Sequence, residues 1–309
     1  MSIKMPILKI AIQKSGGRLA AVSSEFLKSV GFGFTTIPGR LMVKTWDEAA
    51  QVFFLRSADV LEKLEKGSIE LGVVGLNLLA EKFSKGALPA PQVFGQRAHS
   101  QIKPVFPLGF GRCRLVFAAP VSSKITNLKN LKQKRIATSY PNLVRTFLRA
   151  RGIKPGSIVV QRGSVEIAPE SGEAEAIADL VESGRTLMTH SLREVGEIFE
   201  SQAYLMANLK FANSARGKKI LQGVRVRLAA LKLAAEKKYV MLNCPQQKLA
   251  KIKKILPAAV SPTVLPLAKG GEFAVHSVAP EAEIWKMLPA LQKAGARDIL
   301  ILNVEKLIQ

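Results

Sequence analysis

The segment from Glu175 to Leu187, EAIADLVESGRTL, has residues that could bind a phosphorylated sugar. A phosphate needs several backbone N–H groups that point into one concavity, with hydroxyl donors and no bulky side chain in the way. An acidic and apolar strand here runs directly into a polar turn that meets these needs, formed by Glu182, Ser183, Gly184, Arg185 and Thr186. Asp179, just upstream, could accept hydrogen bonds from sugar hydroxyls. The same letters also describe an ordinary β-turn, so the pattern alone leaves both interpretations open.

Three other segments carry polar or charged residues at the ends of predicted strands. The segment KSGGRL places Lys14 and Arg18 just before a predicted helix, whose N-terminus favours anions. ATSYPN at 137–142 also precedes a helix. In GSVEIAP, Glu166 stands in an apolar run, where a carboxylate is costly unless it is hydrogen-bonded or matched to a ligand. Because ligands of α/β proteins bind where strands end, the four segments together favour a ligand site.

The cysteines and histidines form no metal-binding or nucleophilic pattern. Cys113 and Cys244 are 131 positions apart, and His99, His190 and His276 are scattered. None has the spacing of a zinc site or of a local Cys/His pair. The sequence therefore predicts two buried, reduced thiols and no metal ion bound directly by the protein.

Strand-like runs alternate with amphipathic helices along the chain, and this alternation predicts an α/β fold. The helix that begins at Pro141 illustrates the pattern, because proline occupies its first turn and its apolar residues share one face. The predicted strands are residues 8–13, 52–56, 69–75, 113–120, 135–140, 157–161 and 176–181.

The chain is expected to divide into two lobes and a C-terminal unit. Residues 96–112 contain two prolines and two glycines, which suits a crossing between lobes and gives a boundary near 95. Residues 214–238 predict a basic helix that leads into a separate unit. There the order βαββαβ of a ferredoxin-like domain follows, with strand 239–244, helix 246–256, strands 263–267 and 273–279, helix 281–294 and strand 298–304.

Length and composition exclude several classes of protein. The 309 residues are 48% hydrophobic and carry 46 Lys and Arg against 23 Asp and Glu, a net charge of +23. Disordered, collagen-like and coiled-coil chains are thereby excluded. The longest apolar runs fall short of the roughly 18 residues that cross a bilayer, and the N-terminus has no export signal. We therefore expect a cytoplasmic protein without a membrane partner.

About half of the net charge lies in residues 210–254, which hold thirteen Lys and Arg and one acidic residue. Such a run can bind nucleic acid, or it can be the solvated face of a helix. Only two aromatic residues, Phe211 and Tyr239, lie in it, so platforms for stacking single-stranded bases have little support. Nucleic-acid binding is therefore the disfavoured alternative.

Six segments, in chain order, resemble the ATP phosphoribosyltransferase family of histidine biosynthesis. They are KIAIQKSGGRL, LGVVGLNLL, LGFGRCRL, RIATSYPNLV, GSVEIAP and DLVESGRTL. The terminal part, from KKYVMLNCP through SPTVLPLA, resembles the regulatory domain of the long, hexameric form. The resemblance covers nearly the whole chain.

The resemblance implies an α/β fold with a two-lobed, periplasmic-binding-protein-like catalytic core and a C-terminal ferredoxin-like βαββαβ regulatory domain. The first lobe would comprise 1–95 and 188–213 and the second lobe 96–187, with a linker helix and the regulatory domain in 214–309. The implied reaction transfers the phosphoribosyl group of phosphoribosyl pyrophosphate to ATP and releases pyrophosphate. The cofactor Mg²⁺ would be bound mainly through the pyrophosphate.

The resemblance also implies roles for individual residues. The substrates would be aligned, and their charge balanced, by Lys14, Arg18, Glu166 and Asp179. None of these residues would act as a catalytic acid or base. The implied substrate-binding residues are Asn77, Glu175, Glu182, Ser183, Gly184, Arg185 and Thr186. L-Histidine would inhibit by binding near Asn243, Ser261 and Thr263. The protein would be a homohexamer in exchange with a dimer.

Three positions depart from the family pattern. Gly17 is an extra glycine before Arg18, Glu175 stands where relatives usually have Asp, and Asn243 replaces an Asp that would pair the amino group of histidine. Two alternative functions remain open from the sequence. One is a non-catalytic, two-lobed module that binds a small ligand, and the other is nucleic-acid binding through residues 210–254.

Overall fold

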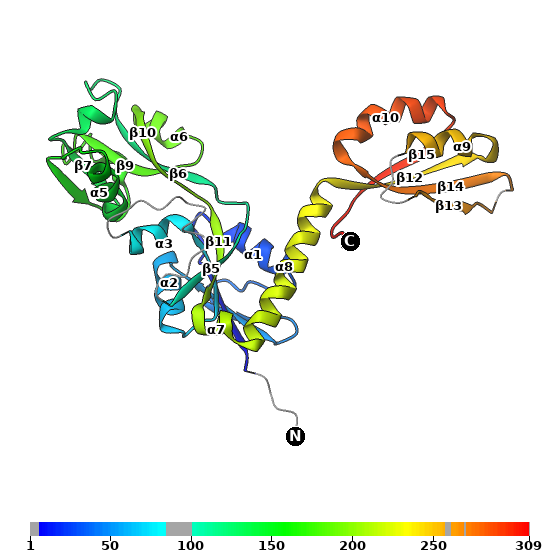
Figure 1. Ribbon diagram of the computed structural model, residues 1–309, viewed down its shortest axis with the longest axis horizontal. Coiled ribbons are helices and arrows are strands. Elements are labelled where there is room, and N and C mark those ends of the chain that lie inside the picture. Colours follow the sequence, from blue (N-terminus) through cyan, green and yellow to red (C-terminus); the bar gives the residue numbers. More distant parts are fainter. Residues whose placement is uncertain (1–5, 85–100, 257–260, 269, 309) are drawn as a thin grey trace. The chain divides into compact units, whose positions relative to one another are not determined.

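The computed structural model describes residues 6–84, 101–256, 261–268 and 270–308. It divides into two compact units, Met1–Lys28 with Phe32–Lys219, and Ser29–Gly31 with Ile220–Gln309 (Figure 1). The first unit holds two sheets and the second holds one. His99 and the expected lobe boundary at 95 lie outside the described residues.

The first lobe is built on a six-stranded sheet. Its strand order is β2 (Met42–Lys44), β3 (Ala50–Leu55), β1 (Leu8–Gln13), β4 (Leu71–Gly75), β11 (Ala203–Asn208) and β5 (Ile102–Pro107). Strands β1, β3 and β4 are parallel, and every residue of β4 is buried. Its helices include α1 (Ala20–Ser29), α2 (Ser57–Lys66), α3 (Leu76–Phe83) and α7 (Leu209–Asn213). Since α3 follows β4 without a loop, its first turn lies at the carboxyl edge of the sheet.

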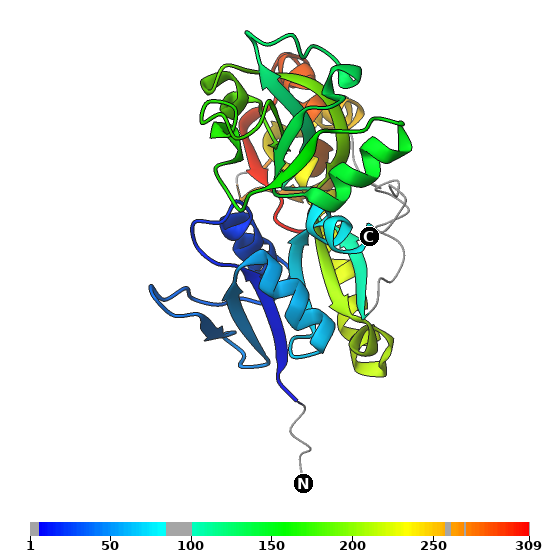
Figure 2. The same cartoon turned by 90° about the vertical axis from the view of Figure 1, so that its left-hand side faces the viewer.

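The second lobe has a five-stranded sheet, and Figure 2 shows the two lobes of this unit one above the other. The strand order is β10 (Leu192–Ser201), β6 (Cys113–Pro120), β9 (Ala176–Val181), β7 (Arg135–Thr138) and β8 (Ser157–Val160). Strands β7, β8 and β9 are parallel. The helices are α5 (Pro141–Ala150) and α6 (Arg185–Thr189), with the 3₁₀ turns η1 (Leu128–Leu131) and η2 (Val165–Ile167). The carboxyl ends of β7 and β9 therefore lie at one edge of this lobe.

Sheet membership corrects the expected lobe boundaries at 95/96 and 187/188. Strand β5 belongs to the first lobe and β10 to the second, so the chain crosses near 108–112 and again at Gln202. The prolines of β5, Pro104 and Pro107, suggested a crossing, but β5 lies at a sheet edge, where a missing N–H is tolerated. Strand β10 has two register shifts against β6, which remove the regular alternation that marks a strand.

The C-terminal unit has the predicted ferredoxin-like order. After α8 (Ala215–Ala235) come β12 (Lys237–Pro245), α9 (Gln246–Ile255), β13 (Thr263–Pro266), β14 (Glu272–Pro280), α10 (Glu281–Lys293) and β15 (Arg297–Asn303). The antiparallel sheet is ordered β13-β14-β12-β15. Alternate residues of β12, Val240, Leu242 and Cys244, are buried in the core. The unit boundary falls inside α8, at 219/220, and not at its start as the sequence suggested.

Several local predictions are confirmed. Strands β1, β6 and β9 have the predicted bounds, and α5 begins at Pro141. Cys113 and Cys244 are buried free thiols. Among the described residues, no helix is long and apolar enough to cross a membrane.

Candidate active site

The turn after β9, residues 182–186, borders a cavity and is called the cradle below. Glu182 to Thr186 line a cavity of about 210 Å³ together with Arg18, Glu166 and Asp179. Gly184 has a φ of 78°, a left-handed conformation that glycine adopts without strain, and it begins α6. The backbone thereby turns sharply at the edge of the cavity, with the hydroxyls of Ser183 and Thr186 among the groups that line it.

Two carboxylates lie in this cavity. Asp179 is half-buried, and burial, together with the nearby charge of Glu166, raises its pKa to about 6, although the backbone N–H of Leu180 opposes the shift. Glu166 lies on η2, after Ser164 in a left-handed conformation with a φ of 49°. A buried carboxylate that shares a cavity with a second one is stabilised by hydroxyl donors or a cation. The structure thus brings together the two acidic residues that the sequence placed in different segments.

The segment KSGGRL lies across the cavity, on the first lobe. Arg18 donates to Glu182, to the carbonyl of Gly111 at 3.3 Å and to Cys113 Sγ at 3.5 Å. Gln13 Oε1 accepts from the backbone N–H of Leu19 at 2.7 Å, and a Cβ at Gly17 would collide with the Gln13 side chain. The extra glycine therefore makes room for the residue that caps the start of α1.

Arg56 is a cationic residue beside Lys14 that sequence reasoning did not single out. Strands β1 and β3 are parallel with Gln13 beside Leu55, so Lys14 and Arg56 follow neighbouring strands at the same edge. The N–H of Lys14 donates to the carbonyl of Leu55 at 2.9 Å. Both side chains are exposed and positive. The end of the predicted strand 52–56 was the signal that could have identified Arg56.

Asn77 connects the two lobes through buried hydrogen bonds. Its Nδ2 donates to the hydroxyl of Tyr140 at 3.0 Å, and its Oδ1 accepts from Ser201 Oγ at 2.9 Å. Burial, with the charge of Asp179, raises the pKa of Tyr140, which keeps its proton. Asn77, Tyr140 and Arg18 line a further cavity of about 90 Å³ between the lobes. Tyr140 belongs to the predicted segment 137–142, but the sequence did not single it out.

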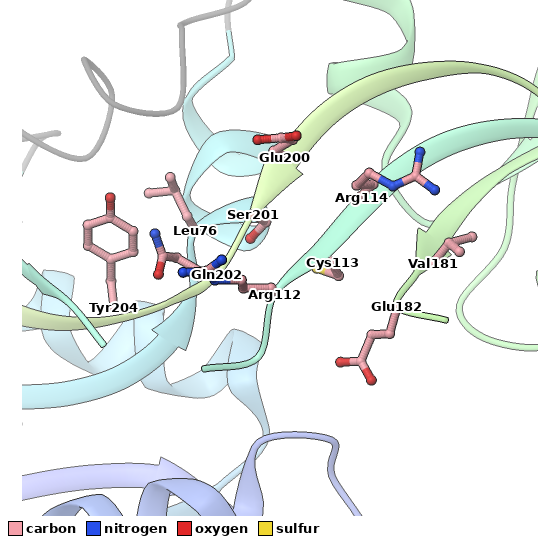
Figure 3. A pocket seen from close by; sticks show the side chains of 10 residues that line it. All are labelled: Leu76, Arg112, Cys113, Arg114, Val181, Glu182, Glu200, Ser201, Gln202 and Tyr204. Carbon is pink, nitrogen blue, oxygen red and sulfur yellow. The ribbon is translucent and has the colours of Figure 1, made fainter. Parts of the chain in front are cut away.

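A larger cavity of about 480 Å³ lies where the chain crosses between the lobes. Figure 3 shows Arg112 to Arg114 on one crossing segment and Glu200 to Gln202 on the other, with Glu182 at the end of β9. Leu76 and Tyr204 supply its apolar part. Arg114 is held by Glu194 at 2.7 Å and Glu197 at 3.1 Å, whereas Arg112 is exposed. Val181 and Glu182 line both this cavity and the cradle, so the two cavities adjoin.

The structure does not bring Glu175 to the cradle, although the sequence predicted that it would. Glu175 precedes β9, whereas the cradle follows it, and strand geometry puts roughly 20 Å between them. Its carboxylate accepts from Arg135 Nη2 at 2.9 Å and from the backbone N–H of Arg135 at 2.7 Å, at the amino end of the neighbouring strand β7. Glu175 therefore pairs with Arg135 at the far edge of the sheet and lines neither the cradle cavity nor the one at the lobe crossing.

The three predicted effector residues do not converge within the C-terminal unit. Asn243 lies on β12 beside Ala274, and Thr263 lies on the edge strand β13 beside His276. One intervening strand and two register positions separate them by roughly 12 Å. Ser261 is exposed just before β13. Asn243 Nδ2 instead donates to the carboxylate of Asp298 on β15, at 3.1 Å.

The sequence also matches known proteins over nearly its whole length. The family model described as ATP phosphoribosyltransferase matches residues 56–229, and that of the HisG C-terminal domain matches 234–306. An ATP phosphoribosyltransferase of Cytophaga hutchinsonii is 38% identical over 98% of this chain and 99% of its own. One of Bacteroides fragilis is 35% identical over 98% of this chain and 100% of its own.

A solved structure agrees with these relatives. It is an ATP phosphoribosyl transferase (HisG:HisZ) complex from Thermotoga maritima, with a TM-score of 0.57 and 27% identity over 72% of this chain and 99% of its own. The chain belongs to the ATP phosphoribosyltransferase family, which catalyses the first step of histidine biosynthesis, in the long form with a C-terminal domain.

Proposed function

We propose that the cradle of Glu182 to Thr186 holds the 5′-phosphate of phosphoribosyl pyrophosphate, with Asp179 and Glu166 on the ribose hydroxyls. The observation that carries this proposal is the shared cavity, which combines backbone donors, two hydroxyls and two carboxylates with Arg18. A sugar phosphate needs these groups at its two ends. A non-catalytic module that binds one small ligand would not need a second cavity beside the cradle cavity.

We propose the adjoining cavity at the lobe crossing for ATP. Leu76 and Tyr204 give it an apolar wall that suits a purine, and Gln202 and Arg112 give it polar and cationic groups. Because Val181 and Glu182 line both cavities, two bound substrates would meet there. This contiguity is what a direct transfer between them requires.

The reaction forms a bond between an adenine ring nitrogen and the anomeric carbon while the bond to pyrophosphate breaks. The ring nitrogen is already a nucleophile, so the rate comes from alignment and from stabilising the negative charge of the leaving group. Arg18, which lines the cradle cavity, would supply positive charge on the side of the first lobe, and Lys14 and Arg56, which directly follow β1 and β3, would add to it. Asp179 and Glu166 would orient the ribose from the second lobe.

Mg²⁺ would bind mainly through the pyrophosphate and add charge neutralisation to the leaving group. Carboxylate oxygens are the protein ligands that Mg²⁺ prefers, and Asp179 and Glu166 provide them in the cradle cavity. These two carboxylates therefore fit a metal ion that enters with its substrate.

The test is pyrophosphate release from phosphoribosyl pyrophosphate with Mg²⁺, with and without ATP. We expect ATP-dependent release, and a loss of about 100-fold in kcat/KM in Thr186→Ala. Thr189→Ala is the matched control, because Thr189 lies on the same short helix but does not line the cavity. Gln202→Ala should raise the KM for ATP alone. If Thr186→Ala and Gln202→Ala had the same kinetic constants as the control Thr189→Ala, the assignment of the site would be contradicted.

We further propose that L-histidine regulates the enzyme through the C-terminal unit. The carboxylate missing at Asn243 is supplied by Asp298, which lies against it at 3.1 Å and could pair an ammonium group. A register shift in β15 and a φ of 51° at Asp298 set this side chain beside Asn243. Thr263, roughly 12 Å away, would contribute only from another subunit. Asp298→Asn should abolish histidine inhibition and leave uninhibited turnover unchanged.

The proposed homohexamer, in exchange with a dimer, has support in the C-terminal sheet. One face of that sheet presents Leu265, Leu300 and Leu302 to solvent, with exposed fractions of 48%, 54% and 47%. Exposed apolar patches of this kind mark protein interfaces. Light scattering of the wild type and of Leu300→Glu would test it, since the variant should be smaller. An unchanged mass would refute this face as the contact.

A further inference from the structure

A contact between α3 of the first lobe and α5 of the second lies outside the proposed substrate sites. Glu81 Oε1 accepts from the backbone N–H of Asn142, and Oε2 from that of Leu143, both at 2.9 Å. In return, Asn142 Nδ2 donates to the backbone carbonyl of Glu81 at 3.0 Å. The carboxylate of one lobe thus caps a helix of the other.

The start of α5 needs this cap. Its own N-cap residue, Tyr140, makes no side-chain cap hydrogen bond, and Pro141 has no N–H. The first free donors are therefore those of Asn142 and Leu143, and among the described residues Glu81 accepts from both. A carboxylate is well suited to this place because the helix N-terminus carries partial positive charge. The sequence segment 137–142, expected to attract an anion, is thus filled by the protein's own Glu81.

The cap is linked to the cleft through neighbours on both helices. Asn77 is one helical turn before Glu81 on α3, and its Nδ2 donates to the Tyr140 hydroxyl at 3.0 Å. Tyr140 and Asn77 line the cavity between the lobes together with Arg18, whereas Glu81 lines none of the cavities described above. A shift of the first turn of α5 would therefore move Tyr140 relative to Asn77 and change the separation of the lobes.

Glu81 is half-buried in this contact. Burial raises the pKa of its carboxyl group, while the two backbone N–H groups and the charge of Arg145 act in the opposite direction. The contact lies beside one core cluster that contains Leu79 and Ala80 of α3 and Leu143 and Phe147 of α5. Its hydrogen bonds to Asn142 are exposed, and the one to the N–H of Leu143 is partly buried and therefore better shielded from water.

We propose that Glu81 is a positioning residue that fixes the closure of the two lobes, through the first turn of α5, without contacting substrate. The kinetic consequence rests on the proposed function of the cleft. If Glu81 no longer fixes the closed arrangement of the two lobes, the binding of substrate must bring the lobes into that arrangement. Part of the binding free energy is then used for this ordering, so the KM for phosphoribosyl pyrophosphate should rise more than kcat falls.

The test compares Glu81→Gln and Glu81→Ala with the wild-type full chain. Glu81→Gln is nearly isosteric and keeps one acceptor, so it is informative even where Glu81→Ala does not fold. Glu62→Gln is the matched control, since Glu62 is an exposed residue on α2. Lobe separation is measured between spin labels at Lys63→Cys and Lys154→Cys, which lie on exposed positions of the two lobes.

We expect Glu81→Gln to broaden the distance distribution between the labels and to raise the KM about fivefold, with kcat changed less than about twofold. An unchanged distance distribution together with an unchanged KM would overturn the proposal, even if amide exchange at 142 and 143 became faster. If the wild type lacks transferase activity, the proposed function fails, and the label distances alone decide the role of Glu81.

Discussion

Arg18 and Glu182 form an ion pair between the two lobes, with 31% and 49% of their side chains exposed. Arg18 follows β1 in the first lobe, and Glu182 begins the cradle after β9 in the second. The guanidinium that would bind substrate phosphates is thus paired with a protein carboxylate. Substrate binding must exchange one anionic partner for another.

Removing Glu182 should therefore help the first substrate to bind. We expect Glu182→Gln to lower the KM for phosphoribosyl pyrophosphate about threefold, because Arg18 no longer has to leave a carboxylate. Arg18→Ala should raise the same KM at least about tenfold. Steady-state kinetics at low and high salt check both, since salt weakens the pair and should reduce the difference between wild type and Glu182→Gln. A rise of the KM in Glu182→Gln would contradict this exchange.

Asp179 should make stability and activity depend on pH in opposite directions. Its folded-state pKa of about 6 lies above the ordinary 3.8. Its contribution to stability is therefore fully present below about pH 4 and is lost as the pH rises through about 6. Binding of ribose hydroxyls requires the ionised carboxylate, so kcat/KM should rise over the same range. Thermal unfolding and a pH-rate profile measure the two effects.

The variant Asp179→Asn separates these effects. At about pH 8 it removes a charged group from a half-buried site, so the free energy of unfolding should increase by about 1–3 kcal/mol. Its turnover should be low at every pH. If Asp179→Asn is less stable than wild type at this pH, the favourable interactions of the ionised carboxylate outweigh the cost of its burial, which would contradict the prediction.

We expect position 17 to require glycine, because a larger side chain would not fit there. In Gly17→Ala the new Cβ would displace the Gln13 side chain and break its hydrogen bond to the N–H of Leu19. We expect a loss of about 1 kcal/mol in unfolding free energy and a higher KM for phosphoribosyl pyrophosphate. A double-mutant cycle with Gln13→Ala measures the coupling, and the two effects should not add. Full additivity would mean that Gln13 is not the obstacle.

Glu175→Gln should leave catalysis unchanged. Glu175 contacts Arg135 at the amino ends of β7 and β9, far from the cradle. The change should alter kcat and KM by less than about twofold. Steady-state kinetics of Asp179→Asn, four positions later in the chain and within β9, provide the comparison. A large loss of activity in Glu175→Gln would show that this residue does belong to the substrate-binding site.

The sequence by itself determined the local elements of this protein. Strand β9 and the turn after it, the helix that starts at Pro141, and the βαββαβ order of the last unit follow from periodicity and turn residues, which act over a few positions. The residues of the cradle are consecutive in the chain, and for this reason their grouping could be predicted before the fold was known.

Tertiary structure decided which residues face the site. Glu175 directly precedes β9 and Asp179 lies within it, yet only Asp179 lines the cradle cavity, because the strand runs from the amino edge of the sheet toward the edge where the cradle begins. Arg56 and Lys14 follow neighbouring strands because β1 and β3 are parallel and in register, and Glu81 caps a helix that begins 60 positions later. Such contacts depend on strand order and on the packing of distant segments, which local sequence patterns do not contain.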